Sequence, residues 1–377
     1  MAISPSNNQT VLITGINGYI ASVLGLHLLK AGYSLRGTAR RISSTDLLLK
    51  GPYAPYIDRV KIYEVPDITI PGAFDEAVKD VDGIFHTASP VNFSLTSYTQ
   101  TVDAAVSGTN TLLHSALQSG PLLKTVVITS SVAAVVNLVD EAYTFTESDY
   151  ASKSLAKAQL DLKEGRQSPG GILYGASKTA AEQAVWKFRD EQKPKWALTT
   201  INPSVVIGTP VALPESGEKL NETLRPLYRI LAGTTKSIPP TIGVGGLVDV
   251  SDVAYMHTWA YEHPEKSDGQ RYIACAGSGP VQAQADILRD YLRERGDDAL
   301  LGNIPLGNPG EGYVGYNKET AKVESVGWAP GKPRVSGEKA EREMGFKYKG
   351  LLESVAETAE ALRPLLRGEE RRGEVLT

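Results

Sequence analysis

The chain has 377 residues, of which 41% are hydrophobic and 22% are charged, and its formal net charge is −4 at pH 7. A chain of this length exceeds what one hydrophobic core usually serves, so we expect one large domain with a smaller lobe, or two domains. Because the charge is slightly negative and the Lys and Arg residues are scattered, we expect neither nucleic acid nor a membrane as a partner.

Short hydrophobic runs alternate with helical patterns up to residue 203, which predicts a parallel sheet covered by helices on both faces. The predicted strands are residues 11–14, 34–39, 60–65, 83–88, 125–129 and 197–202, and the predicted helices are residues 18–30, 73–79, 97–119 and 174–192. Strands and helices in this order predict an α/β fold with a doubly wound, parallel (Rossmann) sheet.

The first predicted strand runs directly into the turn Thr14-Gly15-Ile16-Asn17-Gly18-Tyr19-Ile20-Ala21, and a helix follows. Gly15 permits a tight turn, Gly18 lets the backbone approach a pyrophosphate, and Ala21 is small enough for the helix to pack on the strand. The free N–H groups at the start of that helix then point at the anion. An ordinary βα turn is the alternative, but the position between strand and helix favours a dinucleotide site.

The end of the second predicted strand indicates which dinucleotide is bound. NAD-binding proteins of this architecture place an Asp or Glu there, about 20 residues past the glycines, to hold the ribose hydroxyls. Here the stretch Leu35-Arg36-Gly37-Thr38-Ala39-Arg40-Arg41 contains no carboxylate. Arg40 suits a 2′-phosphate through paired hydrogen bonds, assisted by Arg41 or Ser44, so we expect NADP(H). The alternative is a solvated basic turn.

Two later segments carry the residues that we expect to do chemistry. The predicted strand 125–129 ends in Ser130 and Ser131, at the edge where doubly wound folds bind ligands. A serine there can donate a hydrogen bond to a carbonyl oxygen, or it can cap the next segment. Tyr174 and Lys178 lie four residues apart on one helix face, and the ammonium is expected to lower the pKa of the phenol for proton transfer. Because the chain has 17 Tyr, chance alone is expected to produce about one Tyr–Lys pair with this spacing. The pair is therefore informative only together with its surroundings.

Beyond Pro203 the pattern is less regular. We expect a helix near 222–232, a strand at 247–250 and a helix at 252–262, with Asp249 and Asp252 as caps at the strand-to-helix step. The predicted organisation comprises a disordered N-terminus (1–9), an NADP-binding domain (10–207, also receiving 245–275), a smaller C-terminal substrate-binding lobe (208–244 and 276–349), a C-terminal helix (350–366) and a frayed tail (367–377).

Several polar residues and the cysteine have unexceptional interpretations. His86, at the end of an apolar strand, is expected to be a packed core residue, and Arg289, Arg293 and Arg295 to form a solvated helix face. The single cysteine, Cys275, excludes an intramolecular disulfide and fits a reducing compartment. The five histidines show no ligand spacing, and the chain shows neither a signal peptide nor a membrane span, so we expect a cytoplasmic protein without a metal.

Taken in order, these segments resemble the extended short-chain dehydrogenase/reductase family, and within it the dihydroflavonol-reductase-like group with its fungal NADPH-dependent methylglyoxal and carbonyl reductases. The resemblance covers nearly the whole chain. It is carried by residues 14–21, 37–40, 66–68, 86–90, 129–131, 174–178, 202–203, 248–250 and 302–305. It implies an NADPH-dependent reductase that acts on a ketone or aldehyde carbonyl, with Tyr174 as proton donor.

The resemblance also implies a role for each site residue. Ser131 would polarise the substrate oxygen, Tyr174 would be the acid, and Lys178 would hold the nicotinamide ribose and lower the pKa of Tyr174. Besides Tyr174 and Lys178, the implied NADP(H) contacts are Gly15, Asn17, Gly18, Tyr19, Ile20, Arg40, Ser44, Asp67, Ile68, Thr87, Pro203, Val206 and Thr223. We expect Ser89, Val91 and Phe93, together with Ser131, to form the substrate wall, whose apolar character suits a small neutral carbonyl compound.

One departure from the family pattern and two other functions stay open. Family members often carry Asn where this chain has Ser107, so a proton relay through that position is in question. A sugar-nucleotide epimerase or dehydratase would need cations for a diphosphate, and the small lobe offers only the scattered Arg225, Arg229 and Arg271. A non-catalytic NADP-sensing regulator usually lacks the Tyr–Lys pair, which is intact here. We expect a monomer or a homodimer.

Overall fold

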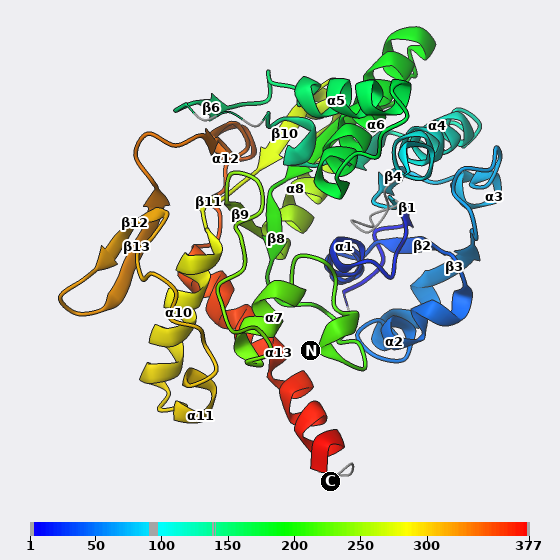
Figure 1. Ribbon diagram of the computed structural model, residues 1–377. Coiled ribbons are helices and arrows are strands. Elements are labelled where there is room, and N and C mark those ends of the chain that lie inside the picture. Colours follow the sequence, from blue (N-terminus) through cyan, green and yellow to red (C-terminus); the bar gives the residue numbers. More distant parts are fainter. Residues whose placement is uncertain (1–3, 90–96, 138, 140, 375–377) are drawn as a thin grey trace. The chain divides into compact units, whose positions relative to one another are not determined.

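The computed structural model describes residues 4–89, 97–137, 139 and 141–374, with side chains up to residue 366. The chain forms two compact units (Figure 1). The first comprises Met1–Leu138, Thr146–Pro203 and Val253–Ile273, and the second comprises Val139–Phe145, Ser204–Asp252 and Ala274–Thr377.

A seven-stranded sheet forms the centre of the first unit, in the order β10-β7-β5-β4-β1-β2-β3. Every pair of neighbours from β3 to β7 is parallel. The strands are β1 (Thr10–Thr14), β2 (Ser34–Ala39), β3 (Val60–Glu64), β4 (Gly83–His86), β5 (Thr125–Thr129), β7 (Ala197–Pro203) and β10 (Arg271–Ala274). The predicted Rossmann sheet is confirmed. The sequence prediction missed β10, because this strand is short and begins with a charged residue.

Successive residues of the buried strands alternate between two helix-covered faces. On one face, Leu12, Ile84 and Val126 join a core cluster that includes residues of α3, α4 and α6. On the other face, the ring centroid of Phe85 lies 5.7 Å from that of Tyr261 on α8. The helices of this unit are α1 (Tyr19–Lys30), α2 (Asp46–Leu49), α3 (Asp75–Val78), α4 (Ala104–Ala116), α5 (Ser152–Lys163), α6 (Gly170–Gln192), α8 (Val250–Glu262, shared with the second unit) and α9 (Pro264–Ser267).

Two helical segments differ from the prediction. The expected helix 97–119 consists of a π-helical turn, Thr99–Asp103, followed by α4. Such turns are rare and have no sequence pattern of their own. The helix that carries Tyr174 begins at Gly170, one turn before its expected start. The prediction missed this first turn because it contains Gly170 and Gly171, and glycine is a poor helix former.

The second unit contains small sheets and packed helices. Its sheets are β11-β9-β8, the hairpin β12-β13 and the pair β14-β6. Its strands are β6 (Thr144–Phe145), β8 (Val205–Ile207), β9 (Gly246–Asp249), β11 (Gly277–Ser278), β12 (Tyr313–Asn317), β13 (Lys322–Trp328) and β14 (Arg334–Val335). Its helices are α7 (Arg225–Leu231), α10 (Val281–Glu294), α11 (Asp298–Leu301), α12 (Glu338–Met344) and α13 (Leu351–Glu374).

The unit boundary differs from the one expected from the sequence. Strands β8 and β9 pair with each other, and β9 pairs with β11, so residues 204–207 and 245–252 belong to the second unit rather than to the first. Helix α13 continues to Glu374, past the expected end at residue 366. Among the described residues, no helix is both long and apolar enough to cross a membrane.

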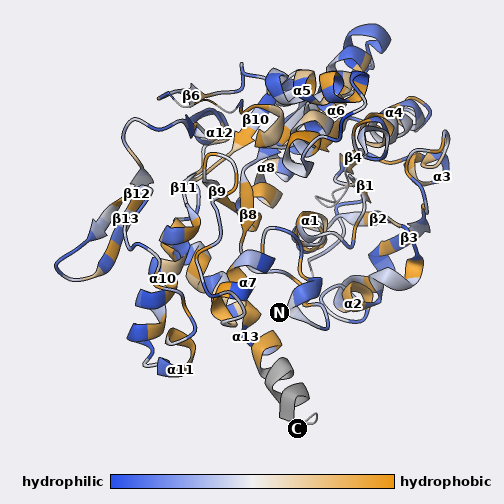
Figure 2. Ribbon diagram, viewed as in Figure 1, coloured by the Kyte–Doolittle hydropathy of each residue, from blue (hydrophilic) through white to orange (hydrophobic). Residues whose placement is uncertain are grey.

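A buried carboxylate organises α10, where the sequence prediction of a fully solvated arginine face is wrong for Arg289. Asp286 accepts hydrogen bonds from Gln282 (2.9 Å), from Tyr313 (2.8 Å) and from the guanidinium of Arg289, which is itself buried. Arg289 also donates to the carbonyl of Pro305 at 2.6 Å, so it ties the irregular segment after α11 to the helix. Figure 2 shows that hydrophilic and hydrophobic residues alternate along α10. The hydropathy pattern alone therefore does not reveal that Arg289 and Asp286 are buried together.

The pH dependence of folding follows from His257, which is fully buried on α8. Its ring hydrogen-bonds the hydroxyl of Thr129 and the carbonyl of Val253, each at 2.7 Å. Burial lowers the pKa of His257 from 6.5 to about 4. The folded protein therefore keeps the ring neutral where the unfolded chain binds a proton, and stability is lost as pH falls from 6.5 towards 4.

We expect the wild type to lose about 2 kcal/mol more unfolding free energy than His257→Gln between about pH 7.5 and pH 5. Urea unfolding followed by circular dichroism measures the two slopes, and comparing them cancels the contributions of other titrating groups. Equal slopes would contradict the neutral, buried state of this ring.

Candidate active site

The glycine turn after β1 leaves no room for side chains. Gly15 has φ of +65°, and a Cβ there would lie 3.3 Å from the Cα of Ala88. A Cβ on Gly18 would lie 3.1 Å from the carbonyl oxygen of Gly15. The N–H of Gly15 donates to the hydroxyl of Thr38 at 3.2 Å, which ties the turn to β2. At these two glycines the turn therefore presents backbone, which a pyrophosphate can approach closely.

A cavity of about 920 Å³ opens beside this turn, over the carboxyl ends of β1, β2 and β4. It brings together many residues predicted for the cofactor, together with the nearest predicted substrate residue. These are Gly15, Asn17, Gly18, Arg40, Ser44, Asp67, Ile68, Thr87 and Ser89. Parallel sheets of this kind bind ligands at this edge, and the cavity has the position of a dinucleotide site.

The basic end of the cavity is formed by the loop after β2. Arg40 and Arg41 line it, and both are exposed. The guanidinium of Arg40 makes no hydrogen bond or ion pair within the described part of the chain. The side-chain amide of Asn17 donates to the hydroxyl of Ser44 at 3.1 Å, so the glycine turn and this loop are connected. An unengaged guanidinium at this position suits a phosphate.

Asp67, Ile68 and Thr87 also line the cavity. Asp67 accepts hydrogen bonds from the N–H and the hydroxyl of Thr69, at 2.8 and 2.7 Å, and these hydrogen bonds lower the pKa of its carboxyl. Ile68 packs against Gly108: a Cβ on Gly108 would lie 2.7 Å from Cδ1 of Ile68, so the contact needs a glycine. The hydroxyl of Thr87 donates to the carbonyl of Thr14, so it is already engaged by the strand.

The predicted catalytic residues lie together in the first unit. The hydroxyl of Tyr174 donates to Oγ of Ser131 at 3.4 Å, and Nζ of Lys178 donates to Oγ of Ser89 at 3.3 Å. Ser131 also accepts from the N–H of Ala133 at 3.1 Å, so the capping role considered from the sequence is present as well. Because Ser89 lines the large cavity, its bond with Lys178 places the ammonium group beside that cavity, one helical turn from Tyr174.

The pKa of Tyr174 shifts in the opposite direction from the one expected from the sequence. The sequence predicted that Lys178 lowers the pKa of Tyr174, but burial raises that pKa and outweighs the opposing hydrogen bond with Ser131. Burial lowers the pKa of Lys178 to about 8, opposed by the negative charge of Glu182. Tyr174 is thus a neutral phenol near neutral pH, which is the form that can give up a proton.

Other predicted site residues lie elsewhere. Tyr19 and Ile20 begin α1 and are half-buried, and Pro203 is the buried end of β7. Val206 and Thr223 belong to the second unit, so their cofactor contacts stay predictions. Val91 and Phe93 lie outside the described residues.

Two further residues have clear surroundings. Ser107 is exposed and lines a different cavity, with Asp75 and His114, so the position in question for a proton relay is not beside Tyr174. His86 is buried as expected: it hydrogen-bonds Thr14 at 2.9 Å, and burial lowers its pKa to about 3.

The sequence prediction missed Glu182, which is buried on α6 one turn after Lys178. Its carboxylate bonds Ser130, Asn202 and Arg271. The spacing from Lys178 was a usable signal, but the partners are far away in sequence. Gln100 and Ala104, which also line the large cavity, lie at the π-helical turn that has no sequence pattern.

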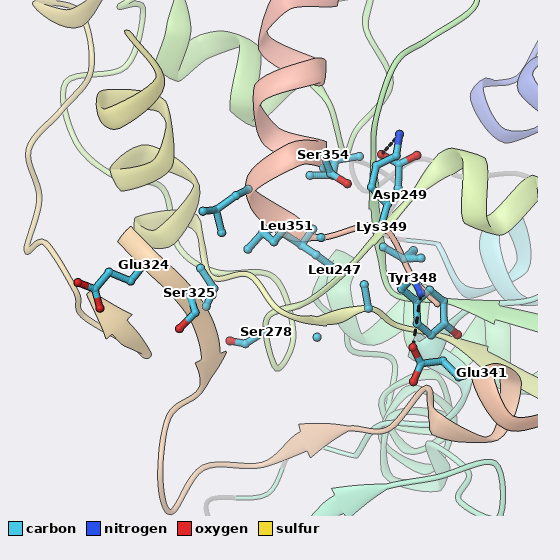
Figure 3. Close-up of a pocket in the computed structure, with 17 residues that line it drawn as sticks. Leu247, Asp249, Ser278, Glu324, Ser325, Glu341, Tyr348, Lys349, Leu351 and Ser354 are labelled. Atoms are coloured by element: carbon cyan, nitrogen blue, oxygen red, sulfur yellow. Dashed lines mark hydrogen bonds and ion pairs between the residues drawn. The ribbon is translucent and has the colours of Figure 1, made fainter. Parts of the chain in front are cut away.

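A separate cavity of about 340 Å³ lies within the second unit and holds none of the predicted site residues (Figure 3). At one end, Lys349 forms ion pairs with Asp249 at 3.8 Å and with Glu357 at 2.7 Å. Asp249 accepts from the N–H of Ser251 at 2.8 Å, which confirms its predicted role as a cap of α8. Among the described residues, no cluster of His, Cys, Asp and Glu is arranged to hold a metal ion.

Residues 11–275 match the NAD dependent epimerase/dehydratase family. The chain belongs to this family. The predicted resemblance to extended short-chain dehydrogenases/reductases is confirmed by this match and by relatives that span nearly the whole chain. The putative NADPH-dependent methylglyoxal reductase GRP2 of Candida albicans is 30% identical, covering 93% of this chain and 99% of its own length. Ketoreductase azaE of Aspergillus niger is 33% identical, covering 84% and 92%.

Solved structures of the family agree with the fold. The yeast methylglyoxal/isovaleraldehyde reductase Gre2, determined in complex with NADPH, superposes with a TM-score of 0.80 at 29% identity, covering 96% of this chain and all of that one. The UDP-glucose 4-epimerase of Thermotoga maritima superposes with a TM-score of 0.63 at 17% identity, which shows a common fold alone.

Proposed function

We propose that the protein is an NADPH-dependent reductase of ketone or aldehyde carbonyls. The observation that carries this proposal is the hydrogen-bonded pair of Ser131 and Tyr174, together with Lys178 one turn farther along α6, whose bonded partner Ser89 lines a dinucleotide-sized cavity. Relatives named as an NADPH-dependent methylglyoxal reductase and a ketoreductase support it.

The residues of the cavity fit NADPH. The bare glycine turn would receive the pyrophosphate, and a Cβ at Gly15 or Gly18 would crowd that space. Arg40 would hold the 2′-phosphate, with Arg41 and Ser44 beside it. Asp67 and Ile68 would meet the adenine. When bound, NADPH supplies the hydride for the carbonyl carbon.

The protein would supply hydrogen bonds and a proton at the carbonyl oxygen. Ser131 would donate to the oxygen as negative charge develops on it. Tyr174, kept neutral by burial, would transfer its phenolic proton to the same oxygen. Lys178 would hold the nicotinamide ribose and place a positive charge beside the nascent phenolate, which stabilises that anion after proton transfer.

The proposal also covers the class of substrate, the cellular compartment and the oligomeric state. The substrate would be a small neutral carbonyl compound, which needs from Ser131 only a hydrogen bond to its oxygen. Cys275 is buried and its pKa is raised to about 11, which is consistent with an unreactive thiol in a reducing cytoplasm. We propose a cytoplasmic monomer or homodimer that binds neither nucleic acid nor a membrane.

The test of this function compares wild type and Tyr174→Phe across aldehydes, diketones and ketoesters, with NADPH oxidation followed by absorbance. Phe keeps the ring but removes the proton, so kcat should fall by about 10²- to 10⁴-fold while NADPH binding persists. Isothermal titration calorimetry measures that binding independently of turnover.

Tyr63→Phe is the matched control for the loss of a phenolic hydroxyl. Tyr63 lies on β3 beside Lys61, and its removal should leave turnover unchanged. Half of the wild-type activity in Tyr174→Phe would refute the assignment of the proton donor. Tight NADPH binding with no turnover of any substrate would instead favour the non-catalytic regulator.

Cofactor preference gives a second prediction. Because hydrogen bonds to a charged group contribute about 1.5–3 kcal/mol, kcat/KM for NADPH should exceed that for NADH by about 10- to 150-fold. Arg40→Ala should remove most of this difference, chiefly through the KM for NADPH. Arg342→Ala, which removes a side chain that is 68% exposed on α12, is the control. Equal kcat/KM values for both cofactors in the wild type would rule out the proposed phosphate contact.

A further inference from the structure

Tyr174, Lys178 and Glu182 recur at intervals of four residues along α6, so they share one side of the helix. The Glu182 side chain is fully buried. One carboxylate oxygen accepts from Nδ2 of Asn202 at 2.6 Å and from the hydroxyl of Ser130. The other accepts from Nε of Arg271. A buried carboxylate is tolerated only with such partners, so its negative charge is held in a defined place.

These bonds reach both sides of the catalytic serine. Ser130 precedes Ser131 at the end of β5, and its hydroxyl is held by Glu182. Asn202 donates to the carbonyl oxygen of Ser131 at 3.2 Å with the same nitrogen that meets Glu182. The carboxylate therefore fixes the backbone that carries Ser131 against the helix that carries Tyr174.

The same carboxylate is the negative charge that faces Lys178. On α6 itself, Tyr174 is neutral because burial raises its pKa. From β4, His86 is neutral as well, because its pKa is about 3. In the described part of the loop after β4, the neutral hydroxyl of Ser89 accepts a hydrogen bond from Lys178. From β10, Arg271 adds a positive charge that pairs with Glu182. With the carboxylate removed, the burial that disfavours the ammonium form of Lys178 would remain without the opposing negative charge.

We propose that Glu182 is a positioning residue for carbonyl reduction: its buried carboxylate fixes the backbone of Ser131 and supplies a negative charge one helical turn from Lys178. The inference rests on the proposed function for its consequence in catalysis. Its electrostatic part concerns Lys178 alone and is measurable without cofactor or substrate.

The test is the titration of Lys178 in the full-length protein, by competitive labelling with acetic anhydride and mass spectrometry. In the wild type the pKa should be about 8. In Glu182→Gln, which keeps the size of the side chain, it should fall to about 7 or below. Glu182→Asp, which keeps the charge, should restore most of the wild-type value. Glu191→Gln, on the same helix but exposed, is the matched control and should leave Lys178 unchanged.

Arg271→Gln gives a variant with the opposite expected sign, and it covers the case in which Glu182→Gln does not fold. Removing the guanidinium frees the carboxylate from its cation, so the pKa of Lys178 should rise. A role in stability alone would lower the melting temperature in both variants without moving the titration in opposite directions. An unchanged Lys178 pKa in the folded variants would overturn the inference.

Activity measurements separate this inference from the proposed function. If both hold, the alkaline limb of the kcat profile should move to lower pH in Glu182→Gln and return in Glu182→Asp. If the wild type reduces no carbonyl while the titration shifts as expected, the proposed function fails and the electrostatic role of Glu182 stands. If reduction proceeds but neither titration nor pH profile moves, Glu182 does not act through Lys178.

Discussion

The buried carboxylate of Glu182 is the interaction on which the rest of the first unit depends. It joins the ends of β5 and β7 and the start of β10 to α6, through Ser130, Asn202 and Arg271. Each donor would lose one acceptor if the carboxylate were absent, and unsatisfied buried polar groups are costly. Arg271 also donates to the carbonyls of Glu147 and Asp149, at 2.5 and 2.7 Å. These acceptors and Glu182 together compensate for the burial of its positive charge.

From this constraint the arrangement of the reactive groups follows. With α6 fixed on the sheet, Tyr174 meets Ser131 at the carboxyl edge of β5, and Lys178 reaches Ser89 after β4. The same edge, farther along at β1 and β2, carries the bare glycine turn and Arg40. A parallel sheet thus collects the glycine turn, a guanidinium and a hydrogen-bonded Ser–Tyr pair in one unit, although they come from distant parts of the sequence.

Much of this arrangement is predictable from sequence because it depends on local pattern. The strands of the central sheet are short apolar runs, and the glycine turn has its characteristic strand and helix on either side. What stays hidden depends on tertiary burial. Arg289 looks like part of a charged helix face, yet it is buried against Asp286. Tyr174 beside Lys178 suggests an acidified phenol, yet burial outweighs the charge. No local pattern links Glu182 with Arg271.

The most direct test of the account follows the hydride itself. NADPH carrying deuterium at the transferable position of its nicotinamide is incubated with the protein and a substrate from the carbonyl series, and the alcohol is examined by mass spectrometry and NMR. The account predicts one deuterium on the carbinol carbon for each NADPH consumed, from the wild-type protein. NADPH consumption that leaves the carbinol carbon free of deuterium, or an isomerised or dehydrated product with no net oxidation of NADPH, would contradict it.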